Sequence, residues 1–194
     1  MGLFKKLKCR FTKTNPVLER LRRDNFISPS AHLSHANTLE LGGNVYIGAD
    51  CRFYCEGGLK IGKSTQFGRE CMILTTNHNY ANADWLPYDD VGILQRVEIG
   101  ENCWFGVRCT ILGGVKIEDG AVIAAGSVVT KSVPRCAIVG GNPARIIGWR
   151  DTSHYEQLAA NNRSYVNNRP IRWQRKSGFK PIMMTVQKNK GHNS

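Results

Sequence analysis

The sequence has no run of about 18 apolar residues, so no helix that spans a bilayer is expected. Its first residues, MGLFKKLKCRF, carry charges where a secretory signal needs an apolar stretch, and export is therefore not expected. Seven cysteines occur with no CxxC pair, which indicates neither a disulfide framework nor a zinc knuckle. These absences favour a cytoplasmic protein in a reducing compartment.

The net charge of +12 is concentrated at the two ends of the 194-residue chain. Residues 1–25 hold eight Lys/Arg against two acids, residues 151–194 again eight against two, and residues 26–150 eleven against eleven. Such clusters suggest an anionic partner, such as a membrane surface, an acidic glycan or nucleic acid. Solvated tails that keep an assembly soluble explain them equally well. Of these partners we expect peripheral contact with the inner membrane face and no nucleic acid.

A large apolar residue returns at every sixth position through the second half of the chain. Six fits neither the 3.6-residue period of a helix nor the simple alternation of a strand. The large residues are Ile99, Phe105, Ile111, Ile117, Ile123 and Val129. Four positions after each comes a small or β-branched residue: Cys103, Cys109, Val115, Ala121, Ser127 and Val133. The repeat continues upstream with slips to about residue 27, and an insertion interrupts it after Ile73.

This repeat predicts a three-sided solenoid. Each unit is expected to form a short strand and a turn, with one large and one small side chain pointing inward. Three units close a coil, and stacked coils pair their strands in parallel at about 4.8 Å per step. Cys51, Cys71, Cys103 and Cys109 fall on the small inward position and are interpreted as core residues rather than nucleophiles. Because the interior is filled, an active site must lie on an outer face, which becomes a cleft only against a second subunit or a protruding loop.

Residues 27–147 resemble the hexapeptide-repeat acyltransferases, above all in the stretch GAVIAAGSVVTKSVPRCAIVGGNPARII. The nearest branch is that of the maltose/galactoside and polysaccharide O-acetyltransferases, which also includes streptogramin-modifying enzymes. The resemblance implies an all-β, left-handed parallel β-helix solenoid with a protruding loop and short flanking helices. It divides the chain into a basic N-terminal flank (1–26), the acyltransferase domain (27–150) with its loop insertion at 77–96, and a helix plus basic tail (151–194).

The resemblance implies a catalytic histidine at the start of the insertion. His78, in TTNH, matches the family's T-x-x-H-like position. A sugar hydroxyl is hardly ionised at neutral pH, so attack on a thioester requires removal of its proton, which a neutral imidazole can take and then return to the departing thiolate. No acyl-enzyme is needed. Four nearby residues, Asn77, Tyr80, Asp84 and Trp85, are candidates for sugar binding, although they could instead form only a small cluster within the loop.

Acetyl-CoA is the implied donor substrate, and no metal is expected. In the family, the aromatic at the position of Trp104 lies near the substrate end, and backbone groups at the position of Ala125 bind the pantetheine arm. Thr130 and Lys131 match residues that meet the adenosine end, and Arg145 matches an arginine of the 3′-phosphate site, where a guanidinium suits a phosphate through paired hydrogen bonds. The resemblance also implies a homotrimer with sites between subunits.

Each flank is expected to hold one short helix. NPVLERLRRDN is a plausible helix that would cover the exposed edge of the first coil. Ser153 and Glu156 form an S-x-x-E capping box, which predicts a helix at about 153–161, before a basic tail. Neither end resembles the N-terminal helical pair of the usual sugar acetyltransferases. A polymer or lipid-linked glycan handled near the inner membrane would suit the basic ends better.

The sequence therefore predicts an acetyl-CoA-dependent O-acetyltransferase acting on a hydroxyl of a sugar or cell-surface polysaccharide. N-acetylation of an amino sugar and O-acetylation of a streptogramin remain open. A γ-type carbonic anhydrase would need three imidazoles converging on zinc, and only His78 is suitably placed. A non-catalytic binding or scaffold solenoid would favour regular outward Thr ladders or featureless faces, and the histidine-bearing insertion argues against it.

Overall fold

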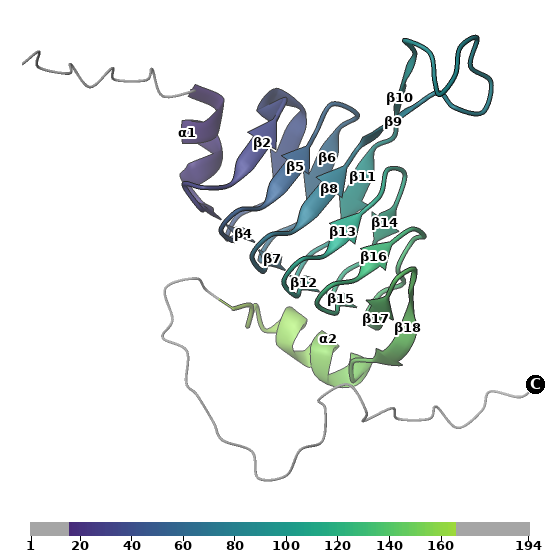
Figure 1. Cartoon of the computed structure of the whole chain (residues 1–194). Coiled ribbons are helices and arrows are strands. Elements are labelled where there is room, and N and C mark those ends of the chain that lie inside the picture. Colours follow the sequence, from purple (N-terminus) through teal and green to yellow (C-terminus); the bar gives the residue numbers. More distant parts are fainter. Residues whose placement is uncertain (1–15, 166–194) are drawn as a thin grey trace, which may run out of the picture.

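The structure is a computed structural model that describes residues 16–165. The chain winds through short strands that lie on three sides in turn, which gives a three-sided column (Figure 1). Strands on each side pair in parallel with those of the coils before and after. The all-β, left-handed parallel β-helix predicted from the sequence is confirmed, with two short helices and a protruding loop.

Each side of the column is one sheet. Face 1 has seven strands, in spatial order β1 (Phe26–Ile27), β4 (Tyr46–Ile47), β7 (Gln66–Phe67), β12 (Trp104–Phe105), β15 (Val122–Ile123), β17 (Ala137–Gly141) and β18 (Ala144–Trp149), of which only β17 and β18 pair antiparallel. Face 2 has β2 (His32–Ser34), β5 (Arg52–Tyr54), β8 (Met72–Leu74), β13 (Thr110–Ile111) and β16 (Val128–Val129). Face 3 has β3 (Leu39–Leu41), β6 (Leu59–Ile61), β11 (Val97–Ile99) and β14 (Lys116–Ile117). The corners where the chain turns from one face to the next are named here the 1–2, 2–3 and 3–1 edges, and the short 3-10 helix η1 (Ala36–Thr38) lies at the first 2–3 turn.

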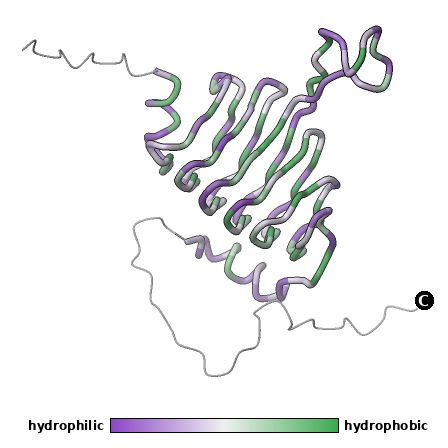
Figure 2. Tube along the Cα trace, viewed as in Figure 1, coloured by the Kyte–Doolittle hydropathy of each residue, from purple (hydrophilic) through white to green (hydrophobic). Residues whose placement is uncertain are grey.

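The inward residues of the repeat form one continuous core. Figure 2 shows apolar and polar residues alternating along the coils, as expected when every second side chain of a strand points inward. Stacked coils bring like residues together: the rings of Phe67 and Phe105 are stacked with centroids 4.3 Å apart, and Phe53 meets Phe67 edge-on at 5.0 Å. These side chains are fully buried, so the column has a filled interior.

The cysteines of the repeat belong to this core, as the sequence predicted. Every free cysteine within residues 16–165 is buried. Desolvation raises the pKa of the Cys55 thiol and of the Cys103 thiol to about 12. A thiol with such a pKa is not ionised near neutral pH, and the thiolate is the nucleophilic form. Cys55 and Cys103 are therefore structural.

A helix lies at each end of the described column. α1 (Pro16–Arg22) covers the first coil, where its Leu21 joins the core, as expected for the N-terminal helix. α2 (Thr152–Ala160) follows β18 and nearly matches the helix predicted at 153–161. No helix within residues 16–165 is long and apolar enough to cross a membrane. The basic stretches expected to contact a membrane fall largely in residues 1–15 and 166–194, outside the described residues.

The predicted capping box of α2 is wrong. The helix begins one residue earlier, and Asp151 is its N-cap: the Asp151 carboxylate accepts a hydrogen bond of 3.0 Å from the His154 amide. Ser153 instead lies inside the first turn, and its hydroxyl donates to the same carboxylate at 2.6 Å. A charged acceptor at the N-terminus of a helix also interacts favourably with the helix dipole, which explains why aspartate takes this position.

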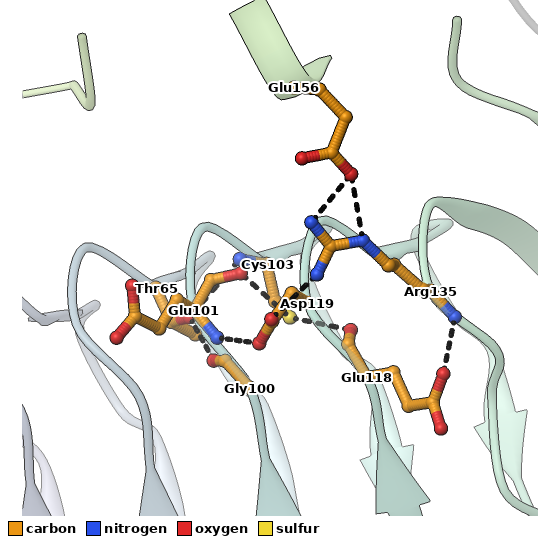
Figure 3. Close-up of polar contacts among 8 residues, drawn as sticks. All are labelled: Thr65, Gly100, Glu101, Cys103, Glu118, Asp119, Arg135 and Glu156. Atoms are coloured by element: carbon orange, nitrogen blue, oxygen red, sulfur yellow. Dashed lines mark hydrogen bonds and ion pairs between the residues drawn. The ribbon is translucent and has the colours of Figure 1, made fainter. Parts of the chain in front are cut away.

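Arg135 fastens α2 to the column at the 3–1 edge (Figure 3). Its guanidinium donates to Glu156 of the helix at 2.7 Å and to Asp119 of the column at 2.9 Å. Asp119 in turn accepts a hydrogen bond of 2.8 Å from the amide of Glu101, one coil earlier. The guanidinium also lies over the ring of Tyr155, 5.2 Å from its centroid. These contacts fix α2 alongside the prism.

Replacing an inward aromatic should cost far more stability than replacing an outward one on the same face. We expect Phe67→Ala to lower the free energy of unfolding by about 3–5 kcal/mol, because the neighbouring rings of Phe53 and Phe105 cannot fill the cavity. Phe26→Ala removes an outward ring of β1 that stacks on Tyr46, and should cost about 1 kcal/mol. Denaturant unfolding of both variants measures the difference, and equal losses would contradict the filled core.

Candidate active site

The insertion forms a hairpin arm, residues 76–94, that leaves the column at the 2–3 edge (Figure 1). Its stem consists of β9 (Thr76–His78) and β10 (Gly92–Leu94), paired antiparallel. Buried Thr75 anchors the stem: its hydroxyl donates to the Tyr54 carbonyl at 2.7 Å and accepts from the Gly57 amide at 2.8 Å. The insertion expected at 77–96 therefore corresponds to a structured arm with a fixed base.

His78 is exposed at the end of β9. Its ring stacks on that of Tyr88, with centroids 3.9 Å apart and planes 18° from parallel. The residue paired with it on β10 is Gly92, where an added Cβ would meet nothing within 4 Å, so no side chain crowds the imidazole from that strand. Within residues 16–165 no hydrogen bond reaches either ring nitrogen. The arm thus presents an imidazole held on one face, with both nitrogens available to a partner.

Asp89 orders the loop that carries Tyr88. Its carboxylate accepts hydrogen bonds from the Asn79 side chain at 2.8 Å, the Val91 amide at 3.0 Å and the Asp84 amide at 3.4 Å. Desolvation raises the pKa of the Asp89 carboxyl, but these hydrogen bonds outweigh it and leave the pKa lowered. The carboxylate form of Asp89 is therefore part of what holds the arm together.

The candidate sugar-binding residues lie along the arm, and Asn77 contacts the backbone of His78. Tyr80 and Trp85 are 70% and 73% exposed, and within the described residues no ring contact joins either to the imidazole. The Asn77 side chain accepts a hydrogen bond of 2.9 Å from the His78 amide. Asp84 is exposed as well. The sugar-binding role of these four residues stays a prediction.

The candidate donor-binding residues occupy three other places on the column. Trp104 points outward from β12 of face 1 and is 55% exposed. Ala125 lies at the 1–2 edge after β15. Thr130 and Lys131 are exposed at the 2–3 edge after β16, two coils beyond the base of the arm. Arg145, on β18, is exposed and donates to the neighbouring carbonyl of Ala144 at 2.9 Å.

Face 1 and the 2–3 edge lie on opposite sides of a three-sided column. One chain therefore cannot bring Trp104 and Ala125 together with His78, whereas Thr130 and Lys131 share the edge of His78. A complete constellation requires the 2–3 edge of one copy to meet face 1 or the 1–2 edge of another.

Sequence reasoning missed Glu56, one coil before the arm on the same 2–3 edge. Its Oε1 accepts a hydrogen bond of 2.7 Å from Ser34 and lies 2.9 Å from Nδ1 of His35, while its buried Oε2 has no partner within the described residues. Desolvation raises the pKa of the Glu56 carboxyl, but the hydrogen bonds from Ser34 and His35 leave it lowered. The available signal was the extra acidic turn EGG at the corner preceding TTNH.

A groove of about 690 Å³ lies on face 1 beside α2. The expectation that a face becomes a cleft only against a second subunit or the arm was therefore incomplete, because α2 packs back along the column and forms a wall. The groove is lined by Tyr46, Ser64, Gln66, Phe67, Gly68, Asn102, Cys103, Trp104, Arg150, Tyr155, Leu158, Ala159, Arg163, Ser164 and Tyr165. Within residues 16–165 no group of three His, Cys, Asp or Glu side chains could hold a metal ion.

The coiled architecture and the protruding arm define the chain as a parallel β-solenoid that carries an exposed histidine outside its repeat. Residues 96–131 match a family model described as the hexapeptide repeat of succinyl-transferase. A putative colanic acid biosynthesis acetyltransferase of Escherichia coli is 29% identical over 128 residues, which cover 66% of this chain and 68% of that protein.

Two solved structures are similar over most of their length. A maltose O-acetyltransferase from Clostridium difficile superposes with a TM-score of 0.62 at 27% identity, covering 76% of this chain and 80% of the other. A hexapeptide-repeat acetyltransferase from Vibrio cholerae, complexed with acetyl coenzyme A, gives a TM-score of 0.60 at 26% identity, covering 64% and 67%. Repeat, fold and comparisons agree in one respect: the chain is similar to hexapeptide-repeat acetyltransferases in sequence and in structure.

The order of the arm should depend on the charge of Asp89. Because its folded pKa is lowered, the stabilisation is present above the usual aspartate pKa and is lost as the pH falls through the folded value. We expect Asp89→Ala to speed amide exchange across residues 79–91, after correction for intrinsic rates, and to remove its acid sensitivity. Asp90→Ala is the control, because Asp90 makes no hydrogen bond or ion pair within residues 16–165. Equal opening in both variants would contradict this assignment.

Proposed function

We propose that this chain transfers an acetyl group from acetyl-CoA to a hydroxyl of a sugar or polysaccharide, with His78 as the general base. The observation that carries the proposal is the exposed imidazole on a structured arm, one coil from the Glu56 carboxylate, whose Oε2 has no hydrogen-bond partner within the described residues. The support for acetyl as the transferred group and for a sugar acceptor is the similarity to a putative colanic acid biosynthesis acetyltransferase of Escherichia coli and to a maltose O-acetyltransferase of Clostridium difficile. For acetylation of an amino sugar or a streptogramin, the described residues supply no comparable observation.

The complete site lies between copies of the chain in this proposal. If each copy sets its 2–3 edge against face 1 and the 1–2 edge of the next, three copies close a ring with three equivalent sites. Each site then combines His78 of one copy with Trp104 and Ala125 of its neighbour. The geometric support is that these residues lie on opposite sides of a single column.

The donor would lie along this seam between copies, on the C-terminal side of the arm. Ala125 and Gly126 leave the backbone accessible at the 1–2 edge, and a Cβ added to Gly126 would meet nothing within 4 Å. An extended pantetheine arm fits such a small-residue edge. Lys131 shares the edge of His78, and Arg145 has no carboxylate partner within the described residues, so both are free to meet phosphate groups.

The acceptor would approach from the N-terminal side of the arm. Glu56 Oε2, buried and unpaired, is suited to accept a hydrogen bond from a sugar hydroxyl, and Ser34 and His35 hold the carboxylate in place. Asn77 and Asp84 add hydrogen-bonding groups on the arm, and the exposed rings of Tyr80 and Trp85 offer faces on which a pyranose can stack.

The chemistry then needs one proton transfer in each direction. The unprotonated ring nitrogen of His78 removes the acceptor hydroxyl proton as the oxygen attacks the thioester carbonyl. The same nitrogen returns that proton to the sulfur as the carbon–sulfur bond breaks. Tyr88, stacked on the imidazole, limits rotation of the ring. The buried thiols of Cys55 and Cys103, whose pKa values are raised, take no part.

The location proposed for this activity is the cytoplasm, at the inner membrane face. Its support is the charge of the two ends, with eight Lys/Arg against two acids in residues 1–25 and the same numbers in residues 151–194. A glycan assembled on a lipid would be met there. Binding to vesicles with and without anionic lipid, before and after both ends are trimmed, tests it, and unchanged binding after trimming would remove its support.

Replacing His78 should slow acetyl transfer strongly and leave the binding of the donor nearly unchanged. We expect His78→Ala to lower turnover by about 10²–10⁴-fold, with little change in the affinity for acetyl-CoA. The measurement is release of free thiol with a panel of simple sugars, capsule fragments, amino sugars and a streptogramin. His154→Ala, an exposed histidine of α2, is the control and should keep full activity. Turnover that hardly changes in His78→Ala would rule out the assigned base.

Arg145 should recognise the phosphate on the ribose of the donor. We expect Arg145→Ala to raise the KM for acetyl-CoA by about tenfold and to leave the KM for acetyl-dephospho-CoA nearly unchanged, because a guanidinium–phosphate pair is lost only with the first donor. Steady-state kinetics with both donors gives the comparison. An equal loss with both would place the phosphate elsewhere.

A further inference from the structure

The groove on face 1 spans three successive coils of the column. Gly68, at the 1–2 edge, lies on one side of it, and α2 with Leu158 and Ala159, at the 3–1 edge, lies on the other. Its floor is formed by outward residues of three successive strands, among them Trp104 of β12. The wall is rigidly attached, because Arg135 links Glu156 of α2 to Asp119 of the column (Figure 3).

Aromatic side chains line both the floor and the wall. Tyr46 and Trp104 project from face 1, Tyr155 belongs to α2, and Tyr165 follows it. Rings presented side by side with polar groups such as Gln66 are suited to stacking on the apolar faces of pyranoses while hydrogen bonds reach their hydroxyls. A volume of about 690 Å³ exceeds what a single sugar ring requires, and it suits an oligosaccharide.

The groove is also cationic and has an unpaired donor. Arg150 and Arg163 line it, and among the described residues no acidic side chain does. Nε of Arg150 is buried without a hydrogen-bond partner, and no carboxylate pairs with this guanidinium within residues 16–165. A buried donor without an acceptor among the described residues is stabilised by a ligand that brings one. A carboxylate or phosphate group fits the guanidinium best.

We propose that this groove binds the non-reacting part of an acidic glycan acceptor, with a carboxylate or phosphate of the glycan on Arg150. The inference rests on the proposed function and names its substrate class. Trp104 connects the groove with the proposed reaction site. It forms part of the groove floor, and it also lies on the face proposed to meet His78 of the next copy. A glycan chain reacting at the seam would therefore extend over Trp104 toward α2, where the arginines lie.

The experiment measures binding of matched oligosaccharides to the full chain by calorimetry. Tetragalacturonate, its methyl ester and a neutral maltotetraose separate charge from chain length, and a sugar 1-phosphate distinguishes a phosphate from a carboxylate. We expect the acid to bind at least about tenfold more tightly than its ester. In Arg150→Gln that preference should disappear, in Arg150→Lys it should be partly kept, and in Arg22→Ala, which removes an exposed cation of α1, it should be unchanged.

A second variant tests the place of binding. Ala159→Trp fills the groove from its wall and should weaken binding of the acid by about tenfold or more without changing the sedimentation of the protein. A changed oligomeric state in Ala159→Trp would show that another copy occupies the groove, and would overturn the proposal. A preference for the acid that survives Arg150→Gln would show that Arg150 does not hold the anion, and would also overturn the proposal.

These experiments distinguish a failure of the proposed groove from a failure of the proposed function. Acid-selective binding that depends on Arg150 supports the groove even if no acetyl transfer is found, in which case only the proposed function falls. Acetyl transfer to a neutral sugar as fast as to the acid, with no selective binding, would instead retain the function and overturn the groove.

Discussion

The stacking of one large inward side chain per six residues is the constraint on which the molecule depends. Because strands of successive coils pair in register, Phe67 lies on Phe105 and the interior is packed solid along its length. A filled column has no internal cavity in which to do chemistry. Every reactive group must therefore project from an edge or a face, or sit on a segment that leaves the repeat.

Two departures from the repeat supply what the column cannot. The arm places an imidazole outside the 2–3 edge and supports it with Tyr88 from its own loop. The helix α2 folds back and converts flat face 1 into a groove. They lie on opposite sides of one chain, so a symmetric assembly is the simplest way to make them act on one substrate. In this arrangement the distance between the donor site and the acceptor site is set by the distance between successive coils.

The sequence predicted the features that depend on local pattern. The repeat identifies the fold, the interruption after Ile73 locates the arm, and the inward cysteines follow from the register. What it missed depends on contacts between distant positions. The pairing of Ser34 with Glu56 joins residues one coil apart, and that of Arg135 with Glu156 folds a helix against an earlier edge. The cap at Asp151 was missed for a different reason: two capping candidates, Asp151 and Ser153, stand two residues apart, and local geometry chooses between them.

Unsatisfied polar atoms occur near both the arm and the groove beside α2. Within the described residues only two buried side-chain atoms lack a hydrogen-bond partner, Oε2 of Glu56 and Nε of Arg150. Each such atom costs about 1–3 kcal/mol in a folded chain, and natural proteins retain few of them. One is an acceptor at the 2–3 edge and the other a donor on the groove of face 1, the two surfaces that the proposed assembly brings together. A glycan in that seam would offer a hydroxyl to Glu56 and an anionic group to Arg150. One ligand would therefore satisfy both unpaired atoms.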